Sequence, residues 1–393
     1  MDNIKKKLSS LNWKPLLASL VCIVLGFVVG LIVMLCVSAS SDEINPEDAT
    51  SAIWLLLCGP FGSIFQSNQL TNLGNVIFYS VPLIMTGLSV AFAFKTGLFN
   101  IGAPGQYIMG TMGCLLVALT INTTNRFGGV MVWILALIVG VLFGALWGAI
   151  PGLLKAHFKI NEVIVGIMSN WIAANISTWV FTNMPSIHST MSSKPSYLTN
   201  VVNNYTPKIG LEYLFPGAYI DLGIIIAIVV AVIVLFLLNK TTFGYEIKAC
   251  GFNRDASKYA GINVKRNIVI SMAIAGGLSG LGACLYYLNP GIMYNYASQY
   301  SSLPSYGFNG IASAFLASCN PVGIIFSSIF IRWISMGGEY LNKLGFNQYI
   351  SDVVIAVIIY LAGFSRVFYE FIDYIVKKKK LKKELPQGEE AKT

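Results

Sequence analysis

Long, uninterrupted apolar stretches are the feature that most limits what this chain can fold into. Residues 16–37 contain no charged side chain, and residues 224–238 are apolar without a break. The hydrocarbon core of a bilayer is about 30 Å thick, and a helix of roughly 20 apolar residues crosses it. A strand of a membrane barrel would instead alternate polar and apolar residues. The stretches therefore predict an all-α polytopic membrane protein.

The charge composition agrees with a membrane environment. Charged residues make up 11% of the 393 residues, against roughly 25% in a soluble domain. The formal net charge is +9, but the basic side chains gather beside apolar stretches rather than among the aromatic residues of a soluble module. We therefore expect membrane lipid, and no nucleic acid, as a partner.

About ten stretches have the composition of a membrane span. They are 16–37, 77–94, 101–121, 130–153, 163–181, 220–238, 268–288, 306–318, 322–337 and 350–363. A further apolar stretch, 51–66, is interrupted by Gly59 and Pro60 and is too short on either side to cross a bilayer. We expect this stretch to be interfacial or partly re-entrant.

The basic residues predict which loops are cytoplasmic, because cytoplasmic loops carry the excess of lysine and arginine. The loop 38–76 has acidic residues and no basic one, whereas 240–266 has six basic residues. An even number of spans then places both termini in the cytoplasm. The expected organisation is a cytoplasmic N-terminus at 1–15, a transmembrane domain at 16–366 with outer loops 38–76 and 183–216 and an inner loop 240–266, and a basic cytoplasmic tail at 367–393.

Polar residues at membrane depth are costly unless they are paired or face water, so they indicate candidate pathways. The segment 99–106 places Asn100 and Gln106 with two glycines and a proline between apolar stretches. It is either an unwound or re-entrant turn lining a cavity or a tight cytoplasmic turn after Lys95. In 161–171, Asn170 lies deep in a span, whereas Glu162 is expected to stabilise the first turn of a helix.

Segment 251–262 lies inside the basic inner loop. Asn253 or Asp255 is expected to cap a short helix that Gly261 ends. Such a helix on the membrane face is a surface that another protein can grip, and the alternative is a solvated loop whose basic residues set the orientation. Segments 305–312 and 320–323 carry glycines and asparagines, which favours broken helices.

Gly276 and Gly280 form a G-x-x-x-G pattern within a span, which is typical of close helix packing. The chain has two histidines and contains no phosphate-binding loop and no zinc-protease motif. We therefore expect no enzymatic activity, no metal and no cofactor bound by this chain.

Five segments in this order resemble the permease subunits of bacterial ABC importers for simple sugars, branched-chain amino acids and nucleosides. They are FNIGAPGQ, NEVIVGIMSNWIA, GFNRDASKYAGINV, AGGLSGLGA and YGFNGIA with NPVG, and they cover about 59–338. The NEVI segment and the long N-terminal part most resemble the larger permease subunit of the nucleoside branch. Relatives usually have Glu in place of Pro104 and Asp in place of Asn309, so this chain lacks two carboxylates.

The resemblance implies a type II ABC importer-like fold with broken or re-entrant segments in a bacterial cytoplasmic membrane. It also implies three partners: a cytoplasmic ABC ATPase that binds ATP and Mg, a second permease (a paralogue or another copy), and an extracellular solute-binding lipoprotein. The implied ATPase-coupling residues are Arg254, Asp255, Ala256, Tyr259 and Gly261. The expected solute-pathway residues, whose amides and ring could contact a nucleoside, are Asn100, Gln106, Asn170, Trp171 and Asn309.

Three alternatives remain open on the sequence. The permease could carry ribose-like sugars or branched-chain amino acids instead of nucleosides. An ion-coupled secondary transporter would need ionisable groups at mid-membrane, where Arg332 is the main candidate. A membrane-embedded enzyme would need paired carboxylates or a histidine cluster, and the sequence contains no such constellation.

Overall fold

The computed structural model describes residues 14–40, 46–61, 69–121, 123, 125–183, 204–292, 294, 303–364 and 370. The expected N-terminus up to residue 13, most of the outer loop 183–216 and nearly all of the tail 367–393 lie outside the described residues. The chain divides into two compact units, residues 1–58 with 337–393 and residues 59–336. The expectation of one transmembrane domain over 16–366 stays a prediction.

The first unit contains the described helices α2 (Lys14–Ala39), α3 (Pro46–Cys58) and α16 (Ile350–Gly363) with a short 3-10 turn at Leu341–Leu344. Helices α2 and α16 pack closely, because Gly26 and Gly30 of α2 lie against Ile358 and Val354 of α16. The stretch expected to be interfacial forms α3, which ends where Gly59 adopts a positive φ of 50°.

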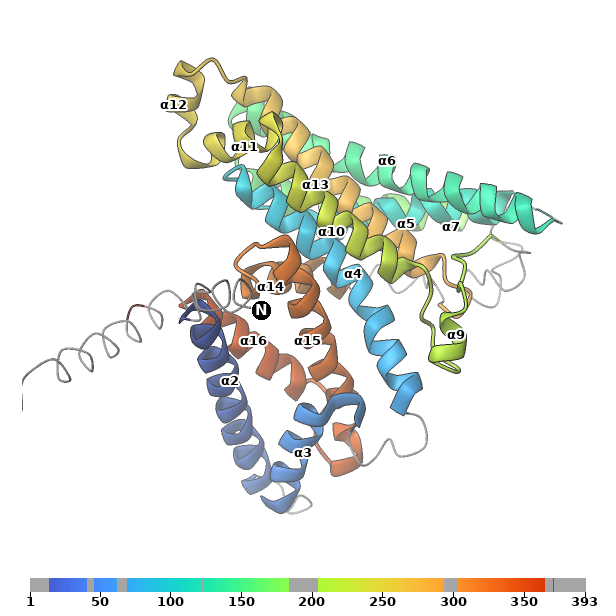
Figure 1. The fold of residues 1–393 in the computed structure, drawn as a ribbon, viewed down its shortest axis with the longest axis vertical. Coiled ribbons are helices and arrows are strands. Elements are labelled where there is room, and N and C mark those ends of the chain that lie inside the picture. Colours follow the sequence, from blue (N-terminus) through green and yellow to red (C-terminus); the bar gives the residue numbers. More distant parts are fainter. Residues whose placement is uncertain are drawn as a thin grey trace, which may run out of the picture. The chain divides into compact units, whose positions relative to one another are not determined.

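The second unit is a helical bundle around α4, α5 and α13 (Figure 1). Its described helices are α4 (Gln69–Lys95), α5 (Ala103–Thr120), α6 (Arg126–Phe158), α7 (Glu162–Asn183), α9 (Leu211–Leu214), α10 (Gly223–Lys240), α11 (Thr242–Phe252), α12 (Arg254–Tyr259), α13 (Val264–Tyr287), α14 (Ser305–Leu316) and α15 (Pro321–Glu339). Every residue of α5 from Ala103 to Leu115 is buried, so α5 runs through the middle of the unit.

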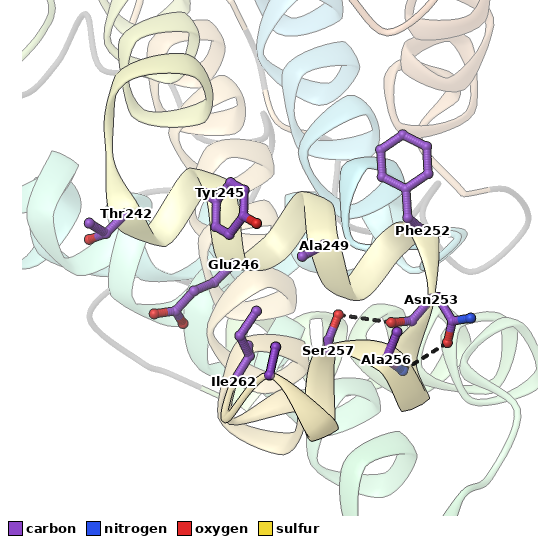
Figure 2. A pocket seen from close by; sticks show the side chains of 10 residues that line it. Thr242, Tyr245, Glu246, Ala249, Phe252, Asn253, Ala256, Ser257 and Ile262 are labelled. Atoms are coloured by element: carbon purple, nitrogen blue, oxygen red, sulfur yellow. Dashed lines mark hydrogen bonds between the residues drawn. The ribbon is translucent and has the colours of Figure 1, made fainter.

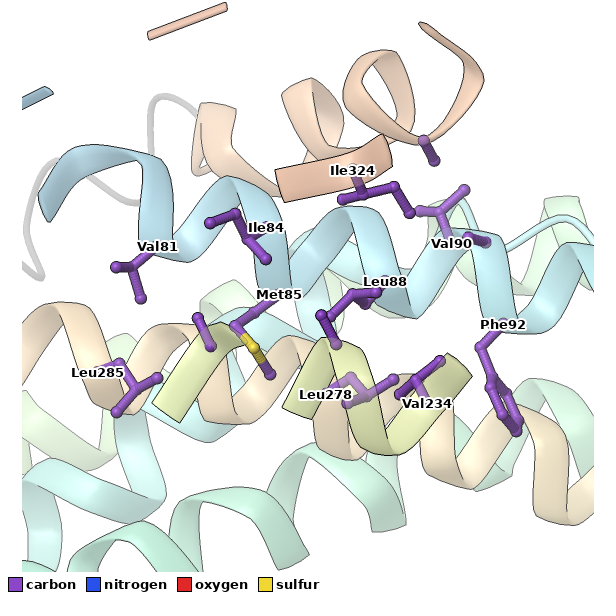
Figure 3. Packing of buried hydrophobic residues seen from close by; sticks show 14 of the residues in the cluster. Val81, Ile84, Met85, Leu88, Val90, Phe92, Val234, Leu278, Leu285 and Ile324 are labelled. Carbon is purple, nitrogen blue, oxygen red and sulfur yellow. The ribbon is translucent and has the colours of Figure 1, made fainter. Parts of the chain in front are cut away.

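The core between α4 and its neighbours is filled by aliphatic side chains (Figure 3). Met85 and Leu88 of α4 pack with Leu278 of α13 and Val234 of α10. The outer helices instead expose large apolar side chains, as Leu146 of α6 and Phe236 of α10 do at 67% and 61%. Such a surface is suited to contact with lipid.

Close packing between α6 and α13 follows from glycines on both helices. A Cβ added to Gly276 of α13 would collide with the backbone of Gly144 and Gly148 on α6, and one added to Gly280 would collide with the carbonyl oxygen of Gly140. The G-x-x-x-G pattern therefore acts as predicted, since small residues let two backbones approach.

Seven of the described helices are long and apolar enough to cross a membrane. They are α2, α4, α6, α7, α10, α13 and α15. Three further expected spans coincide with α5, α14 and α16, which do not meet the same limits of length and composition. Helix α14 has 12 residues, which gives a length of about 18 Å and too little to cross a bilayer. The total of ten spans stays a prediction.

Candidate functional site

Helix α12 forms where the sequence predicts a short capped helix. Asn253 is its N-cap, and its Oδ1 accepts hydrogen bonds from the backbone N–H groups of Asp255 and Ala256, each over 3.0 Å. Figure 2 shows the bond from Ala256. The helix ends at Tyr259, and Gly261 follows with a φ of +80°, a conformation that glycine adopts without strain. Both boundaries predicted from the sequence are therefore correct.

Helices α11 and α12 enclose a surface groove of about 630 Å³ (Figure 2). Its lining residues are Thr242, Tyr245, Glu246, Ala249, Phe252, Asn253, Ala256, Ser257, Ala260 and Ile262. Three aromatic side chains on these two helices are strongly exposed: Tyr259 at 95%, Phe252 at 92% and Tyr245 at 70%. Exposed aromatic residues beside a groove are typical of protein interfaces. We call α11 and α12 together the docking surface.

The docking surface is joined to the turn between α4 and α5. Arg254 Nη2 donates a hydrogen bond to the carbonyl oxygen of Gly97 over 3.0 Å. Gly97 has a positive φ of 71° and lies directly against the backbone of Gly251. A Cβ on either glycine would crowd the backbone of the other. Of the expected coupling residues, Arg254 thus contacts the α4–α5 turn, whereas the Tyr259 ring faces outward.

Asn100 and Gln106 lie together in this turn and at the start of α5. Their side-chain amides form two hydrogen bonds with each other, over 2.8 and 3.0 Å, and Asn100 Nδ2 also donates to Ser89 Oγ. Both side chains are at most 1% exposed. The segment is therefore a buried turn whose polar groups are satisfied inside the protein.

Asn170 of α7 completes the same cluster. Its Oδ1 accepts from the backbone N–H of Gly105 over 2.8 Å, and its Nδ2 donates to the carbonyl oxygen of Ile101 over 3.0 Å. Close approach of the helices is possible because Gly166, one turn earlier on α7, lies against Gly102. We call Asn100, Gln106 and Asn170 the amide cluster. In this conformation it fastens the α4–α5 turn to α7, and its contact with solute stays a prediction.

The other two expected pathway residues lie apart from the amide cluster. Trp171 is 45% exposed, because neighbouring positions on a helix point about 100° apart. Asn309 is half-buried on α14. Pro104, the first departure from related permeases, packs against Gly307 of α14, where a Cβ would collide with the proline ring.

Two charged contacts of the bundle were not identified from the sequence as pairs. Glu162 begins α7, as expected, and its Oε2 lies 2.7 Å from Lys155 Nζ at the end of α6. Arg332 of α15 places its guanidinium 4.5 Å from the centre of the Tyr79 ring on α4. Only the first had a sequence signal, since Lys155 and Glu162 flank the same short connection. Within the described residues, no group of three or more His, Cys, Asp or Glu side chains could hold a metal ion.

Comparison with known proteins gives consistent results across most of the chain. The family model described as branched-chain amino acid transport system / permease component matches residues 72–363. The guanosine ABC transporter permease protein NupP of Bacillus subtilis is 34% identical over 352 residues, 89% of this chain and 93% of NupP. The nucleoside ABC transporter permease protein NupB of Lactococcus lactis is 34% identical over 348 residues, 88% of this chain and 90% of NupB.

A second permease of Bacillus subtilis is also similar to this chain. The guanosine ABC transporter permease protein NupQ is 27% identical over 256 residues, 65% of this chain and 77% of NupQ. One bacterium thus has two different relatives whose names assign both to guanosine transport.

Proposed function

The chain belongs to the family of branched-chain amino acid transport system permease components, and on that premise we propose that it is the membrane-spanning subunit of an ATP-driven importer of nucleosides. The observation that carries the proposal is the similarity over nearly the whole chain to two permeases named for guanosine and nucleosides. The resemblance seen in the sequence and this finding agree.

A cytoplasmic ABC ATPase is the partner that we propose for the docking surface. The exposed rings of Phe252 and Tyr259 and the adjoining groove support this, because aromatic side chains in a groove are common anchors of protein interfaces. ATP and Mg would then bind to the ATPase. Arg254 connects the docking surface to the α4–α5 turn through its hydrogen bond to Gly97. This bond supports a role for Arg254 in coupling ATP hydrolysis to movement of the permease.

The second permease is proposed to be a paralogue of this chain rather than another copy. NupP and NupQ, two different Bacillus subtilis proteins with the same substrate in their names, support this pairing. On the opposite side of the membrane an extracellular lipoprotein would deliver the solute. The basic residues of 240–266 support an orientation with α12 and both termini in the cytoplasm of a bacterial cell.

Transport would proceed by alternating access. Approach of the ATPase subunits on binding ATP moves α12, and the permease pair opens first to one side of the membrane and then to the other. The amide cluster lies on the route of that movement, because it holds the turn that Arg254 contacts.

ATP-dependent uptake into proteoliposomes tests this function. The vesicles contain this chain, its partner permease, the ATPase and the lipoprotein, and they receive radiolabelled guanosine, ribose or leucine in parallel. We expect guanosine uptake that requires ATP. Uptake of ribose or leucine in its place would assign the permease to another branch of the family, and uptake driven by an ion gradient without the ATPase would reject the ABC mechanism.

A further inference from the structure

A group of tyrosines lies at the end of the second unit away from the docking surface. Helix α13 begins at Val264, five residues after α12 ends, and finishes at Tyr287. With 24 residues it is about 36 Å long. Figure 1 shows α12 near one end of α13 and α9 towards the other. The tyrosines near the end of α13 are thus on the side from which an importer with a cytoplasmic α12 receives its solute.

The tyrosine cluster consists of Tyr79 of α4, Tyr107 of α5, Tyr286 and Tyr287 of α13 and Tyr306 of α14. The ring centres of Tyr286 and Tyr306 are 5.0 Å apart, and that of Tyr79 is 6.0 Å from Tyr286. Tyr107 lies 6.1 Å from Tyr306 and 6.2 Å from Tyr287. Five phenol rings from four helices therefore lie together. Aliphatic side chains would be enough to fill a core, so the polar hydroxyls of these rings call for another explanation.

One hydroxyl of the cluster has an unmet hydrogen bond. Tyr107 is completely buried, and its Oη has no hydrogen-bond partner in the described part of the chain. The hydroxyl of Tyr306 in contrast donates to that of Tyr286 over 3.3 Å. A buried polar group without a partner is unfavourable, so a polar molecule that reached Tyr107 would stabilise the cluster.

A cation lies at the edge of the tyrosine cluster. The Arg332 guanidinium lies over the Tyr79 ring, and α15, which carries it, is apolar and long enough to cross a membrane. Charged residues at such a position usually mark the path of a substrate. The side chains of Tyr79, Tyr286, Tyr306 and Arg332 are all partly exposed, so a molecule from outside the bundle can contact them.

We propose that Tyr79, Tyr286, Tyr306 and Arg332 form an entry site that binds the base of a purine nucleoside, an inference that rests on the proposed function. Aromatic rings stack on any base, and phenol hydroxyls can bond to ribose. A guanidinium offers two parallel donors to O6 and N7 of guanine, whereas adenine presents an amino group where guanine has O6. The entry site therefore selects guanosine or inosine over adenosine.

Uptake kinetics in the reconstituted complex test the rings. Tyr286→Leu removes a stacking surface, and we expect the KM for guanosine to rise about tenfold with little change in the maximal rate or in ATP hydrolysis. Tyr286→Phe keeps the ring and should raise the KM by less than about threefold. Tyr360→Leu, which removes an exposed tyrosine of α16, is the matched control and should leave the KM unchanged.

Two further variants separate binding from a purely structural role. Arg332→Gln should abolish the preference for guanosine over adenosine, measured as the ratio of their uptake efficiencies. Tyr107→Phe removes the unpartnered hydroxyl of a buried ring that is not part of the entry site, so it should raise the unfolding temperature and leave the preference for guanosine unchanged. Loss of the preference in Tyr107→Phe as well would indicate a structural role of the tyrosine cluster instead of base recognition.

The outcomes distinguish this inference from the proposed function. Wild-type uptake of guanosine with an unchanged KM in Tyr286→Leu and an unchanged ratio in Arg332→Gln overturns the entry site and leaves the importer intact. A wild-type complex that takes up no nucleoside overturns the proposed function itself. If Tyr286→Leu fails to assemble, the guanosine-to-adenosine ratio of Arg332→Gln decides.

Discussion

Arg254 and Gly97 are 157 positions apart in the sequence, and the guanidinium Nη2 of the first donates to the carbonyl oxygen of the second over 3.0 Å. Gly97 lies in the turn that leads from α4 into α5, the buried central helix. Asn170 binds Ile101 in the same turn and Gly105 at the start of α5, so one short segment is held both by the docking surface and by α7.

Replacing Arg254 should uncouple ATP hydrolysis from transport. In Arg254→Ala the bond to Gly97 is lost, and we expect uptake per ATP hydrolysed to fall about tenfold. Simultaneous measurement of ATP hydrolysis and guanosine uptake gives this ratio. Lys240→Ala, which removes an exposed cation from the end of α10, is the control. Equal ratios in wild type and Arg254→Ala would contradict a coupling role.

Asn170→Ala should destabilise the permease. The substitution leaves the N–H of Gly105 and the carbonyl of Ile101 buried without a partner, at a cost of about 1–3 kcal/mol. The unfolding temperature of the detergent-solubilised protein should therefore fall by several degrees. Asn175→Ala is the control, because Asn175 is exposed and bonds within its own helix at Trp171. A similar fall in both variants would argue against the amide cluster as a fastening point.

Gly276→Ala should disturb the contact between α6 and α13. The added methyl group would collide with the carbonyl oxygen of Gly144, and overpacking of this kind costs about 1–3 kcal/mol. Gly277→Ala is a matched control on the same helix, since its Cβ would lie 3.4 Å from Val141 Cγ1, an ordinary contact. Size-exclusion chromatography and thermal unfolding compare the two. Equal stability of both variants would refute the glycine contact.

Stability should depend on pH through Asp221, which lies before α10 and outside the span that this helix forms. Burial raises the pKa of its carboxyl from 3.8 to about 7, although hydrogen bonds from Asn289 and Gly223 and the charge of Lys208 oppose the rise. The folded protein then holds a proton that the unfolded chain releases. Its contribution to the free energy of unfolding is complete below pH 3.8 and is lost as the pH rises to about 7.

Asp221→Asn tests this dependence, because an amide does not titrate. The unfolding temperature of the wild type should fall between about pH 4 and pH 7, and that of the variant should fall less. A variant with the same pH dependence as the wild type would show that other groups cause it.

Several features follow from the sequence because their causes are local. Apolar stretches long enough to cross a bilayer predict α2, α7 and α10 within a few residues, since each helix satisfies its own backbone. Both ends of helix α12 can be predicted from the sequence. Asn253 caps its start through the backbone N–H groups two and three residues later, and Gly261 adopts a positive φ just after its end. The resemblance to ABC permeases likewise depends on short segments read in order.

The tertiary structure alone decided which polar groups meet. Asn100, Gln106 and Asn170 were each recognised as polar residues in apolar surroundings. The fold of the α4–α5 turn pairs Asn100 with Gln106, and the packing of α5 against α7 brings Asn170 to the backbone of the same segment. Tyr79, Tyr107, Tyr286 and Tyr306 gave no signal as a group, because four helices far apart in the sequence bring them together. Apolar length is a property of one segment, whereas a binding site depends on how the segments pack.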